Sequence, residues 1–343
     1  MEGLVSNWSS TARTLPKSYI FPPEKRPGQL NFPLDKTIPV IDLSNYDHDP
    51  TSTIEQILKA GQEYGIFQVI NHGVSKELVD ETMKVFEEFH AMPAKDKARE
   101  CSKDPNKISC RLYTSSENFP TEELHYWRDA LVHPCHPLDE HMQFWPQNPI
   151  RYREIVGKYT VEVRKLANKI LELIIQGLGL SPGYFSGELS ENPVVLVNHY
   201  PPCPEPSLTL GLAKHSDPSL ITILLQGNVP GLQVSKDGQW VVVEPLPHAF
   251  IVNIGYILQV ISNGKLKGVE HRVVTNSSVP RTTASLFIYP SNDSLIKPAA
   301  TLADASNNPP LYRAFQYKDF RSYYVSNRAD AKKVHEFVDR YNS

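Results

Sequence analysis

Hydrophobic residues recur at helical spacing through much of the first half of the chain. The clearest stripe lies between Arg151 and Leu178 and consists of Val163, Leu166, Ala167, Ile170, Leu171, Ile174 and Leu178. This spacing predicts one long helix that packs on a sheet. Similar stretches at 54–61 and 78–89 predict two further helices, and short apolar runs at 38–43 and 65–70 predict two strands.

The pattern changes near Pro193. Short apolar or alternating runs now follow one another, separated by Gly, Pro and Asn, at 194–200, 219–226, 231–234, 240–244, 249–255, 270–275 and 281–289. Short strands at such regular spacing predict a β-sandwich or a jelly roll. Helices followed by strands indicate an α+β fold in which the helices brace one sheet of the β core.

We expect a single domain over residues 1–343. Residues 1–37 are polar and rich in proline, and we interpret them as an arm laid over the domain. The mainly helical part is 38–192 and the jelly-roll core is 193–300. Residues 301–343 predict a helical tail that acts as a lid. Its aromatic run is Phe315, Tyr317, Phe320, Tyr323 and Tyr324.

The charges nearly balance, with 35 Lys and Arg against 38 Asp and Glu and a formal net charge of −3. No Lys/Arg cluster forms a patch for phosphate groups, so we expect no nucleic-acid partner. No apolar run approaches the ~20 residues that span a bilayer, and no secretory signal is recognisable, so we expect no membrane partner. Four cysteines without CxxC spacing favour a reduced, cytoplasmic protein, and we expect a monomer.

His215 and Asp217 stand two positions apart, just before the apolar run Leu220–Leu225. On extended chain this spacing puts both side chains on one face. An imidazole and a carboxylate are two of the three ligands of a 2-His-1-carboxylate iron site. His271, 54 residues after Asp217, is the best candidate for the third. A His-x-Asp pair by itself is also common in surface turns, so the surrounding residues have to decide.

A second polar cluster is centred on Arg281. The segment 276–280 predicts a turn that joins the strand of His271 to the strand of Arg281 in a hairpin. A buried arginine beside a metal needs an anion as partner, and its planar guanidinium suits a carboxylate. A single arginine without such neighbours is more typical of a surface ion pair. The polar side chains expected around this anion are Thr283, Tyr200 and Asn198.

Other histidines fit a catalytic role less well. His72 lies in an Asn-His-Gly turn, where it is interpreted as a turn residue bonded to backbone. His133, His136 and His141 are close in sequence, but their spacing fits no closed Cys/His zinc site. The prolines between them indicate a loop.

Several short motifs occur together. They are Asn198-His-Tyr-Pro-Pro-Cys-Pro, Gly211-Leu-Ala-Lys-His-Ser-Asp, Gly231-Leu-Gln-Val, Ser262-Asn-Gly, His271-Arg and Pro280-Arg-Thr-Thr. Through them the chain resembles the plant 2-oxoglutarate- and Fe(II)-dependent dioxygenases from about Ile38 to Tyr324. It is most similar to their hyoscyamine hydroxylase-like branch and next to the salicylate hydroxylase-like group. The branch residues are Val5-Ser-Asn-Trp-Ser, Tyr126-Trp-Arg-Asp and Cys135-His-Pro-Leu.

This resemblance implies a double-stranded β-helix, Fe(II), 2-oxoglutarate as cosubstrate, O2, and ascorbate as reductant. Carried over position by position, it implies His215, Asp217 and His271 as both the catalytic residues and the iron ligands. The residues implied to hold 2-oxoglutarate are Arg281, Thr283, Tyr200 and Asn198. The chain departs from the family at Tyr256, where Asp is usual, and this departure questions only local substrate contacts or packing.

The implied reaction is hydroxylation, or another oxidation, of an unactivated C–H bond in a small plant specialised metabolite, phenolic or hormone, with release of succinate and CO2. Two alternatives stay open, namely an ethylene-forming-type oxidase that uses no 2-oxoglutarate and a non-catalytic small-molecule receptor on the same fold. Complete iron ligands argue against the receptor. The residues expected to contact substrate are Phe287, Tyr113, Glu117, Phe320 and Tyr324.

Overall fold

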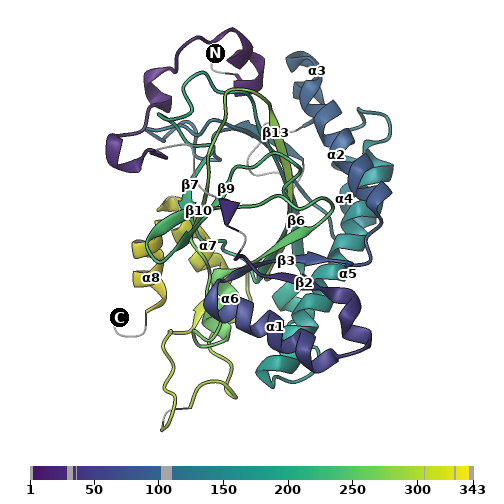
Figure 1. Cartoon of the computed structure of the whole chain (residues 1–343), viewed down its shortest axis with the longest axis vertical. Coiled ribbons are helices and arrows are strands. Elements are labelled where there is room, and N and C mark those ends of the chain that lie inside the picture. Colours follow the sequence, from purple (N-terminus) through teal and green to yellow (C-terminus); the bar gives the residue numbers. More distant parts are fainter. Residues whose placement is uncertain are drawn as a thin grey trace.

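Two β-sheets form the centre of the molecule (Figure 1). The computed structural model describes residues 3–28, 34–35, 37–101, 110–304, 306–327 and 330–339. The larger sheet has the order β2 (Val40–Asp42), β3 (Ile66–Ile70), β11 (Phe250–Ile254), β8 (Ile221–Leu225), β13 (Arg281–Tyr289), β6 (Asn192–Tyr200), β5 (Asp129–Pro134) and β4 (Arg111–Thr114). The smaller sheet has the order β1 (Leu34–Asp35), β10 (Gln239–Val243), β9 (Leu232–Lys236), β12 (His271–Val273) and β7 (Leu212–His215).

The two sheets pack face to face. Leu224 and Ile251 of the larger sheet share one buried cluster with Leu232 and Val234 of the smaller sheet. Such a pair of mainly antiparallel sheets with an apolar interior is a jelly roll, so the predicted fold is confirmed. A third, two-stranded sheet of β14 (Leu295–Ile296) and β15 (Phe315–Gln316) leads into the C-terminal tail.

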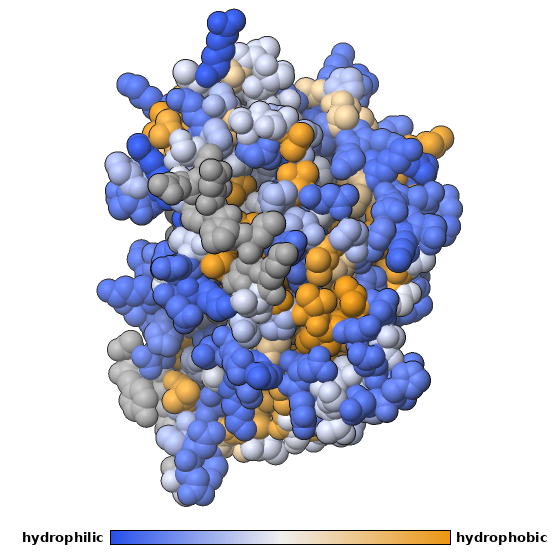
Figure 2. Space-filling model, in the orientation of Figure 1, coloured by the Kyte–Doolittle hydropathy of each residue, from blue (hydrophilic) through white to orange (hydrophobic). Residues whose placement is uncertain are grey.

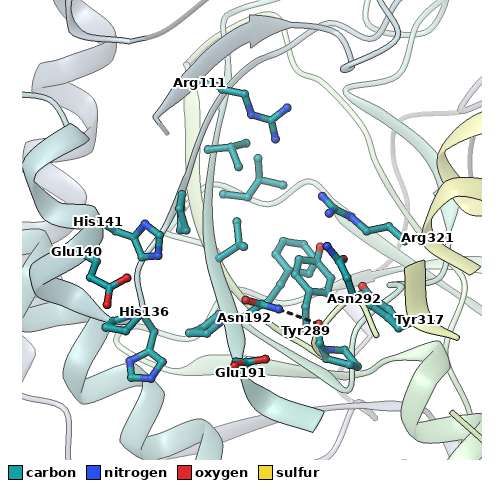
Figure 3. A pocket seen from close by; sticks show the side chains of 18 of the residues that line it. Arg111, His136, Glu140, His141, Glu191, Asn192, Tyr289, Asn292, Tyr317 and Arg321 are labelled. Carbon is teal, nitrogen blue, oxygen red and sulfur yellow. Dashed lines mark hydrogen bonds between the residues drawn. The ribbon is translucent and has the colours of Figure 1, made fainter. Parts of the chain in front are cut away.

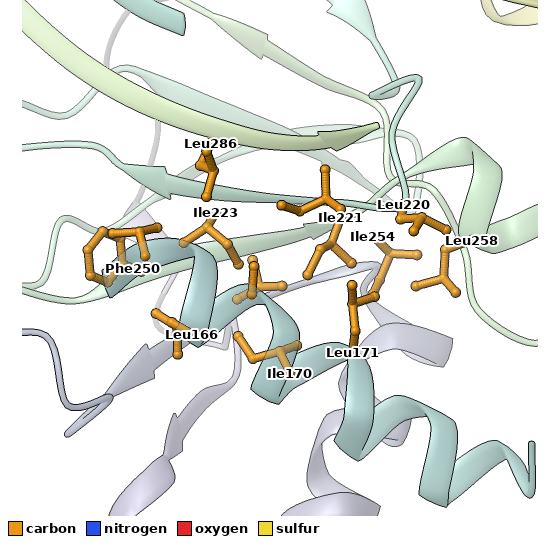
Figure 4. Packing of buried hydrophobic residues seen from close by; sticks show 14 of the residues in the cluster. Leu166, Ile170, Leu171, Leu220, Ile221, Ile223, Phe250, Ile254, Leu258 and Leu286 are labelled. Atoms are coloured by element: carbon orange, nitrogen blue, oxygen red, sulfur yellow. The ribbon is translucent and has the colours of Figure 1, made fainter. Parts of the chain in front are cut away.

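Helices brace the outer face of the larger sheet. In chain order the helices are α1 (Pro50–Glu63), α2 (Lys76–Ala91), α3 (Ala94–Glu100), α4 (Leu138–His141), α5 (Tyr152–Leu178), α6 (Tyr256–Ile261), α7 (Tyr317–Ser326) and α8 (Ala331–Val338). Helix α5 is the predicted long helix, and Figure 4 shows Leu166, Ile170 and Leu171 of its stripe against Ile221 and Ile223 of β8. Gly179, with φ of 69°, ends this helix in a left-handed conformation that glycine adopts without steric cost.

Both ends of the chain pack on this core. In the N-terminal arm, the backbone N–H groups of Val5 and Ser6 donate to the two carboxylate oxygens of the buried Asp129, at 2.8 and 2.9 Å. In the tail, Phe320 and Val334 belong to the same large apolar cluster as α5. Purple and yellow ribbons in Figure 1 show the arm and the tail on different sides of the sheets.

Two of the local expectations were wrong. The segment after His271 does not return as a hairpin, because β12 pairs with β7 and β9 in one sheet whereas β13 pairs with β6 and β8 in the other. The segment 276–280 therefore crosses between the sheets. The histidines at 133 and 141 do not lie in a loop. His133 is fully buried on strand β5, where the proline after it still pairs with β6, and His141 is the last residue of helix α4.

One face of the molecule is mainly polar. Figure 2 shows this face, on which most side chains are hydrophilic and several hydrophobic ones gather right of its centre. Among the helices in the described part of the chain, none combines the length and the apolar character needed to cross a membrane.

Candidate active site

Three potential metal ligands meet inside the jelly roll. His215 ends β7 and lies directly opposite His271, the first residue of the neighbouring strand β12. Asp217 lies two residues after His215, and the two side chains point to the same side, as the spacing predicted. Oδ1 of Asp217 lies 3.6 Å from Nε2 of His215 and 3.6 Å from Nε2 of His271. The three ligand atoms all lie within 4.8 Å of one another, which suits one shared metal ion.

Hydrogen bonds orient each ligand. Nδ1 of His215 donates to the carbonyl of Ala213 at 2.9 Å, and Nδ1 of His271 donates to the carbonyl of Val269 at 3.2 Å. Each ring then carries its proton on Nδ1 and turns the lone pair of Nε2 towards Asp217. Partners of this kind fix the tautomer and orientation of metal-binding histidines.

The carboxylate of Asp217 is held in the same way. Its Oδ2 accepts hydrogen bonds from the hydroxyl of Thr222 at 2.6 Å and from the amide of Asn253 at 3.2 Å, which leaves Oδ1 for a metal. Sequence reasoning missed both donors. The available signal was a polar residue within an apolar strand, since Thr222 interrupts the run of β8 and Asn253 the run of β11.

The protonation states also suit a cation. Burial alone would raise the pKa of Asp217, but the charges of His271 and His215 and the hydrogen bond from Thr222 lower it below its ordinary value. Burial, together with the nearby His215, lowers the pKa of His271 to about 4. Near neutral pH the site therefore offers an ionised carboxylate and a neutral imidazole, which are the forms that bind metal.

A buried guanidinium lies across the same interior. In the antiparallel pair of β13 and β6, Arg281 stands opposite Tyr200 and Thr283 stands opposite Asn198. Nε of Arg281 donates to the carbonyl of Val229 at 2.9 Å, and its guanidinium carbon lies 5.4 Å from the centre of the Tyr200 ring. Burial lowers the pKa of Arg281. Within the described ranges, no carboxylate forms an ion pair with this arginine, so a buried cation is left for an anionic ligand.

Two motif glycines make room for this arrangement. A Cβ on Gly211 would lie 2.6 Å from Cδ1 of Tyr200, and a Cβ on Gly231 would lie 3.1 Å from Cδ and Nε of Arg281. Both glycines therefore allow the backbone of the smaller sheet to approach the aromatic and guanidinium groups of the larger one.

Asn198 lies beside the site as expected, opposite Thr283 in the pair of β6 and β13. Its side-chain oxygen accepts a hydrogen bond from Nη1 of Arg128 at 2.8 Å, while Nε of Arg128 donates to the carbonyl of Ser115 at 2.8 Å. Asn198 lines the site cavity, but its acceptor atom already has a partner in the protein. It therefore links the site to the segment before β5.

The triad and Arg281 line one small cavity, which adjoins a larger one. The small cavity has a volume of about 60 Å³ and contains the side chains of His215, Asp217, His271 and Arg281 in its wall. The larger cavity has a volume of about 660 Å³ and lies outside it, between β4, β5 and the tail. Leu196 and Phe287 line both, so these two residues mark the point at which the cavities meet.

Comparison with known proteins decides the family. The sequence profile of the 2OG-Fe(II) oxygenase superfamily matches residues 191–290, and that of the non-haem dioxygenase in morphine synthesis N-terminal domain matches 38–148. Hyoscyamine 6-dioxygenase of Hyoscyamus niger is 44% identical over 340 residues, which cover 96% of both chains. The chain belongs to the 2OG-Fe(II) oxygenase superfamily.

Other relatives extend this family assignment. Protein DOWNY MILDEW RESISTANCE 6 of Arabidopsis thaliana is 43% identical, over 92% of this chain and 93% of that protein. A crystal structure of JOX2 in complex with 2OG, Fe and JA superposes with a TM-score of 0.82 at 35% identity, covering 93% and 92% of the two chains. The chain is therefore a 2-oxoglutarate-dependent dioxygenase, and the cluster of His215, Asp217 and His271 suits the iron of this family.

The expected substrate residues fall into two groups in this oxygenase. Phe287 lines both cavities, and Tyr113 and Glu117 line the larger one. Phe320 and Tyr324 line neither. Phe320 is fully buried and stacks on Tyr256, and the hydroxyl of Tyr324 donates to the carbonyl of Ser216 at 2.8 Å.

The tail nevertheless reaches the larger cavity through other residues. Tyr317 and Arg321, one helical turn apart on α7, form part of its wall, as Figure 3 shows. Figure 3 also shows Arg111 and Arg321 on opposite sides, with both guanidinium groups directed into the space between. Sequence reasoning did not select these residues, nor the following members of the wall: His136, Glu140, His141, Glu191, Asn192, Tyr289 and Asn292.

Tyr256, the position at which we expected a departure from the family, serves packing. Its backbone N–H donates to the carbonyl of Asp217 at 2.7 Å, and its hydroxyl lies 3.3 Å from Nδ1 of His335 in the tail. The ring therefore joins the segment of the triad to the tail and does not face either cavity. His72 lies in the predicted turn, with Nε2 2.8 Å from the carbonyl of His248.

Proposed function

We propose that this oxygenase hydroxylates an unactivated C–H bond of a small, ring-containing plant metabolite bound in the larger cavity. The observation that carries the proposal is the shared wall of Leu196 and Phe287, through which the larger cavity meets the triad. A cavity of about 660 Å³ is of the size that encloses a small organic molecule. Aromatic side chains, including Tyr113, Tyr289 and Tyr317, suit a ring in the ligand.

Arg281, Thr283 and Tyr200 hold the cosubstrate in this proposal. Arg281 supplies a buried guanidinium without a carboxylate partner among the described residues, and Thr283 lies two positions along the same strand. A dicarboxylate of the size of 2-oxoglutarate can direct its distal carboxylate to Arg281 and its other end to the metal. Asn198 holds Arg128 beside them.

When bound, Fe(II) together with 2-oxoglutarate and O2 supplies the oxidation of the C–H bond, with release of succinate and CO2. The residues of the chain hold the reacting groups in position and exclude water from them. The two histidines and Asp217 present three ligand atoms on one side of the small cavity, with Arg281 also in its wall. Phe287 and Leu196 form an apolar boundary between the two cavities, so a substrate in the larger cavity would approach the metal site across apolar side chains.

The charged side chains of the larger cavity are of both signs and select no charge of substrate. Glu117, which could have attracted a cation, forms an ion pair with Arg111 at 2.6 Å. Arg321 has no carboxylate partner within the described part of the chain, and its guanidinium points into the cavity. The same wall also contains Glu140 and Glu191, so its two arginines stand against three glutamates and it carries no net positive charge.

A succinate assay tests the proposal. Purified protein with Fe(II), ascorbate, 2-oxoglutarate and a panel of acidic, neutral and basic ring-containing plant metabolites should release succinate with at least one compound. Mass spectrometry should then find a product heavier by one oxygen atom. A product lighter by two hydrogens would identify a desaturase instead, and no release above the substrate-free rate with any compound would contradict the proposal.

A variant pair tests the position of the substrate. Phe287→Ala should reduce substrate-driven succinate release while 2-oxoglutarate binding persists, because residue 287 lines both cavities. Phe144→Ala is the matched control, since Phe144 is exposed and lines neither cavity. Equal turnover by the two variants would place the substrate elsewhere.

We also propose that the enzyme acts as a monomer in the cytoplasm with ascorbate as reductant. The triad, Arg281 and both cavities are formed by one chain. The four cysteines are free thiols, as in a reducing compartment. Light scattering of the purified protein and imaging of a fluorescent fusion test the first two points, and omission of ascorbate from the assay tests the third.

A further inference from the structure

Two cysteines distant from the triad lie in direct contact. Cys101 directly follows α3 and Cys110 directly precedes β4. Their sulfur atoms are only 2.9 Å apart, and both are free thiols. The other two cysteines differ, because Cys135 donates its thiol hydrogen to the carbonyl of Pro193 at 3.3 Å and Cys203 is buried in a separate cluster beneath the N-terminal arm.

We propose that Cys101 and Cys110 form a reversible thiol–disulfide site, oxidised by a low-molecular-weight disulfide such as glutathione disulfide. The contact between the two sulfur atoms means that a bond can form with little movement of the backbone. Neither cysteine belongs to the triad or lines the two cavities. The site is therefore separate from the oxygenase reaction.

The exposure of the two thiols assigns their roles. Cys101 is partly exposed, whereas Cys110 is 1% exposed. Burial, helped by the hydrogen bond and the charge of Cys101, raises the pKa of Cys110 well above its ordinary value. An external disulfide can reach Cys101 only, so Cys101 attacks first and Cys110 completes the bond.

Each step balances in atoms and electrons. Cys101 first releases its thiol proton to solvent. Its thiolate then attacks one sulfur of glutathione disulfide, the S–S bond breaks, and the released glutathione thiolate takes up a proton from solvent. Sulfur of Cys110 then attacks Cys101, displaces the second glutathione and passes its proton to it. The two cysteines lose two electrons and glutathione disulfide becomes two glutathione molecules.

The site adjoins the wall of the larger cavity. Cys110 directly precedes Arg111, which pairs with Glu117 and lines that cavity. A disulfide would tie the end of α3 to the strand that carries Arg111 and Tyr113. Oxidation should therefore alter the KM for a substrate and leave that for 2-oxoglutarate unchanged. This consequence rests on the proposed function, whereas the disulfide itself does not.

Peptide mapping tests the site without an activity assay. The full chain is equilibrated in glutathione buffers of increasing oxidised fraction, quenched with acid, alkylated and digested with trypsin. We expect a cross-linked pair of peptides containing Cys101 and Cys110, lighter by two hydrogens than the sum of the free peptides. The link should disappear when dithiothreitol is added.

Variants separate the two roles. Cys110→Ser should stop at a glutathione adduct on Cys101, while Cys101→Ser should leave Cys110 without an adduct. The double change Cys135→Ser and Cys203→Ser is the control and should keep the cross-link. Failure of the unmodified chain to form the link in the most oxidising buffer, or a link that forms only between molecules, would overturn the proposal.

Discussion

Thr222 donates its hydroxyl hydrogen to Oδ2 of Asp217 at 2.6 Å, on the opposite oxygen from the one that faces the two histidines. Asp217 lies in the segment after β7 of the smaller sheet, whereas Thr222 lies on β8 of the larger sheet. The bond therefore fixes the carboxylate of the triad against the larger sheet.

Replacement of Thr222 by Val should weaken Fe(II) binding by about 10- to 100-fold, because outer partners of metal ligands contribute in this range. Thr160→Val is the matched control, since the hydroxyl of this buried residue bonds to Gly157 within α5. Metal titrations of the two variants check the prediction. An unchanged Fe(II) affinity in Thr222→Val would show that Asn253 alone orients Asp217.

Replacement of Arg281 by Lys should lower the affinity for 2-oxoglutarate. A point charge then replaces a planar fork, and loss of a charge-assisted contact costs ~1.5–3 kcal/mol, or about one to two decades in affinity. Calorimetric titration of the metal-loaded protein without O2 measures this. Arg164→Lys, a change on α5, is the control and should leave the affinity for 2-oxoglutarate unchanged. If Arg281→Lys weakens only substrate binding, the guanidinium serves the substrate.

Gly211→Ala should impair the proposed 2-oxoglutarate site because it displaces the ring of Tyr200. A Cβ at this position would lie 2.6 and 2.7 Å from two carbons of the Tyr200 ring, so the ring has to move. We expect a higher KM for 2-oxoglutarate with Fe(II) affinity retained. Gly157→Ala in α5 is the control, since its Cβ would meet only ordinary contacts and should stabilise the helix by about 0.5–1 kcal/mol. Equal KM values for the two variants would contradict the steric argument.

Much of this architecture could be predicted because periodicity records which face of an element is buried. The stripe of α5 and the strand of Arg281–Tyr289 follow directly from spacings of about 3.6 and 2 residues. The triad was predictable for a related reason, since His215 and Asp217 are close in sequence and the family motifs identify His271. Periodicity does not say which sheet a strand joins, so the crossing between β12 and β13 was mistaken for a hairpin.

The substrate cavity was harder to predict because its wall comes from distant segments. Aromatic residues on α7 look alike in sequence, yet Tyr317 faces the larger cavity while Phe320 packs in the core. Only the docking of the tail decides which side of the helix is covered. Thr222 and Asn253 were missed for a similar reason, because a polar residue within a buried strand shows its purpose only through its partner.

The stability of the fold should decrease as the pH falls below about 6.5, in part through His133. This histidine is fully buried, its Nε2 lies 2.9 Å from the hydroxyl of Tyr152, and burial lowers its pKa to about 3. Between the two pKa values the unfolded chain binds one proton more than the folded chain at this position. Its contribution is therefore fully present above pH 6.5 and is lost as the pH falls from 6.5 towards 3.

The expected slope is about 1.4 kcal/mol of unfolding free energy per pH unit for this one proton, measured by urea unfolding between pH 6 and 4. His133→Gln keeps a polar side chain beside Tyr152 but cannot take up the proton, so its slope should be smaller by that amount. His48→Gln is the control, because His48 is exposed in the folded chain as it is in the unfolded one. Equal slopes in wild-type protein and His133→Gln would mean that His133 gains its proton without unfolding, through local opening of β5 near Tyr152.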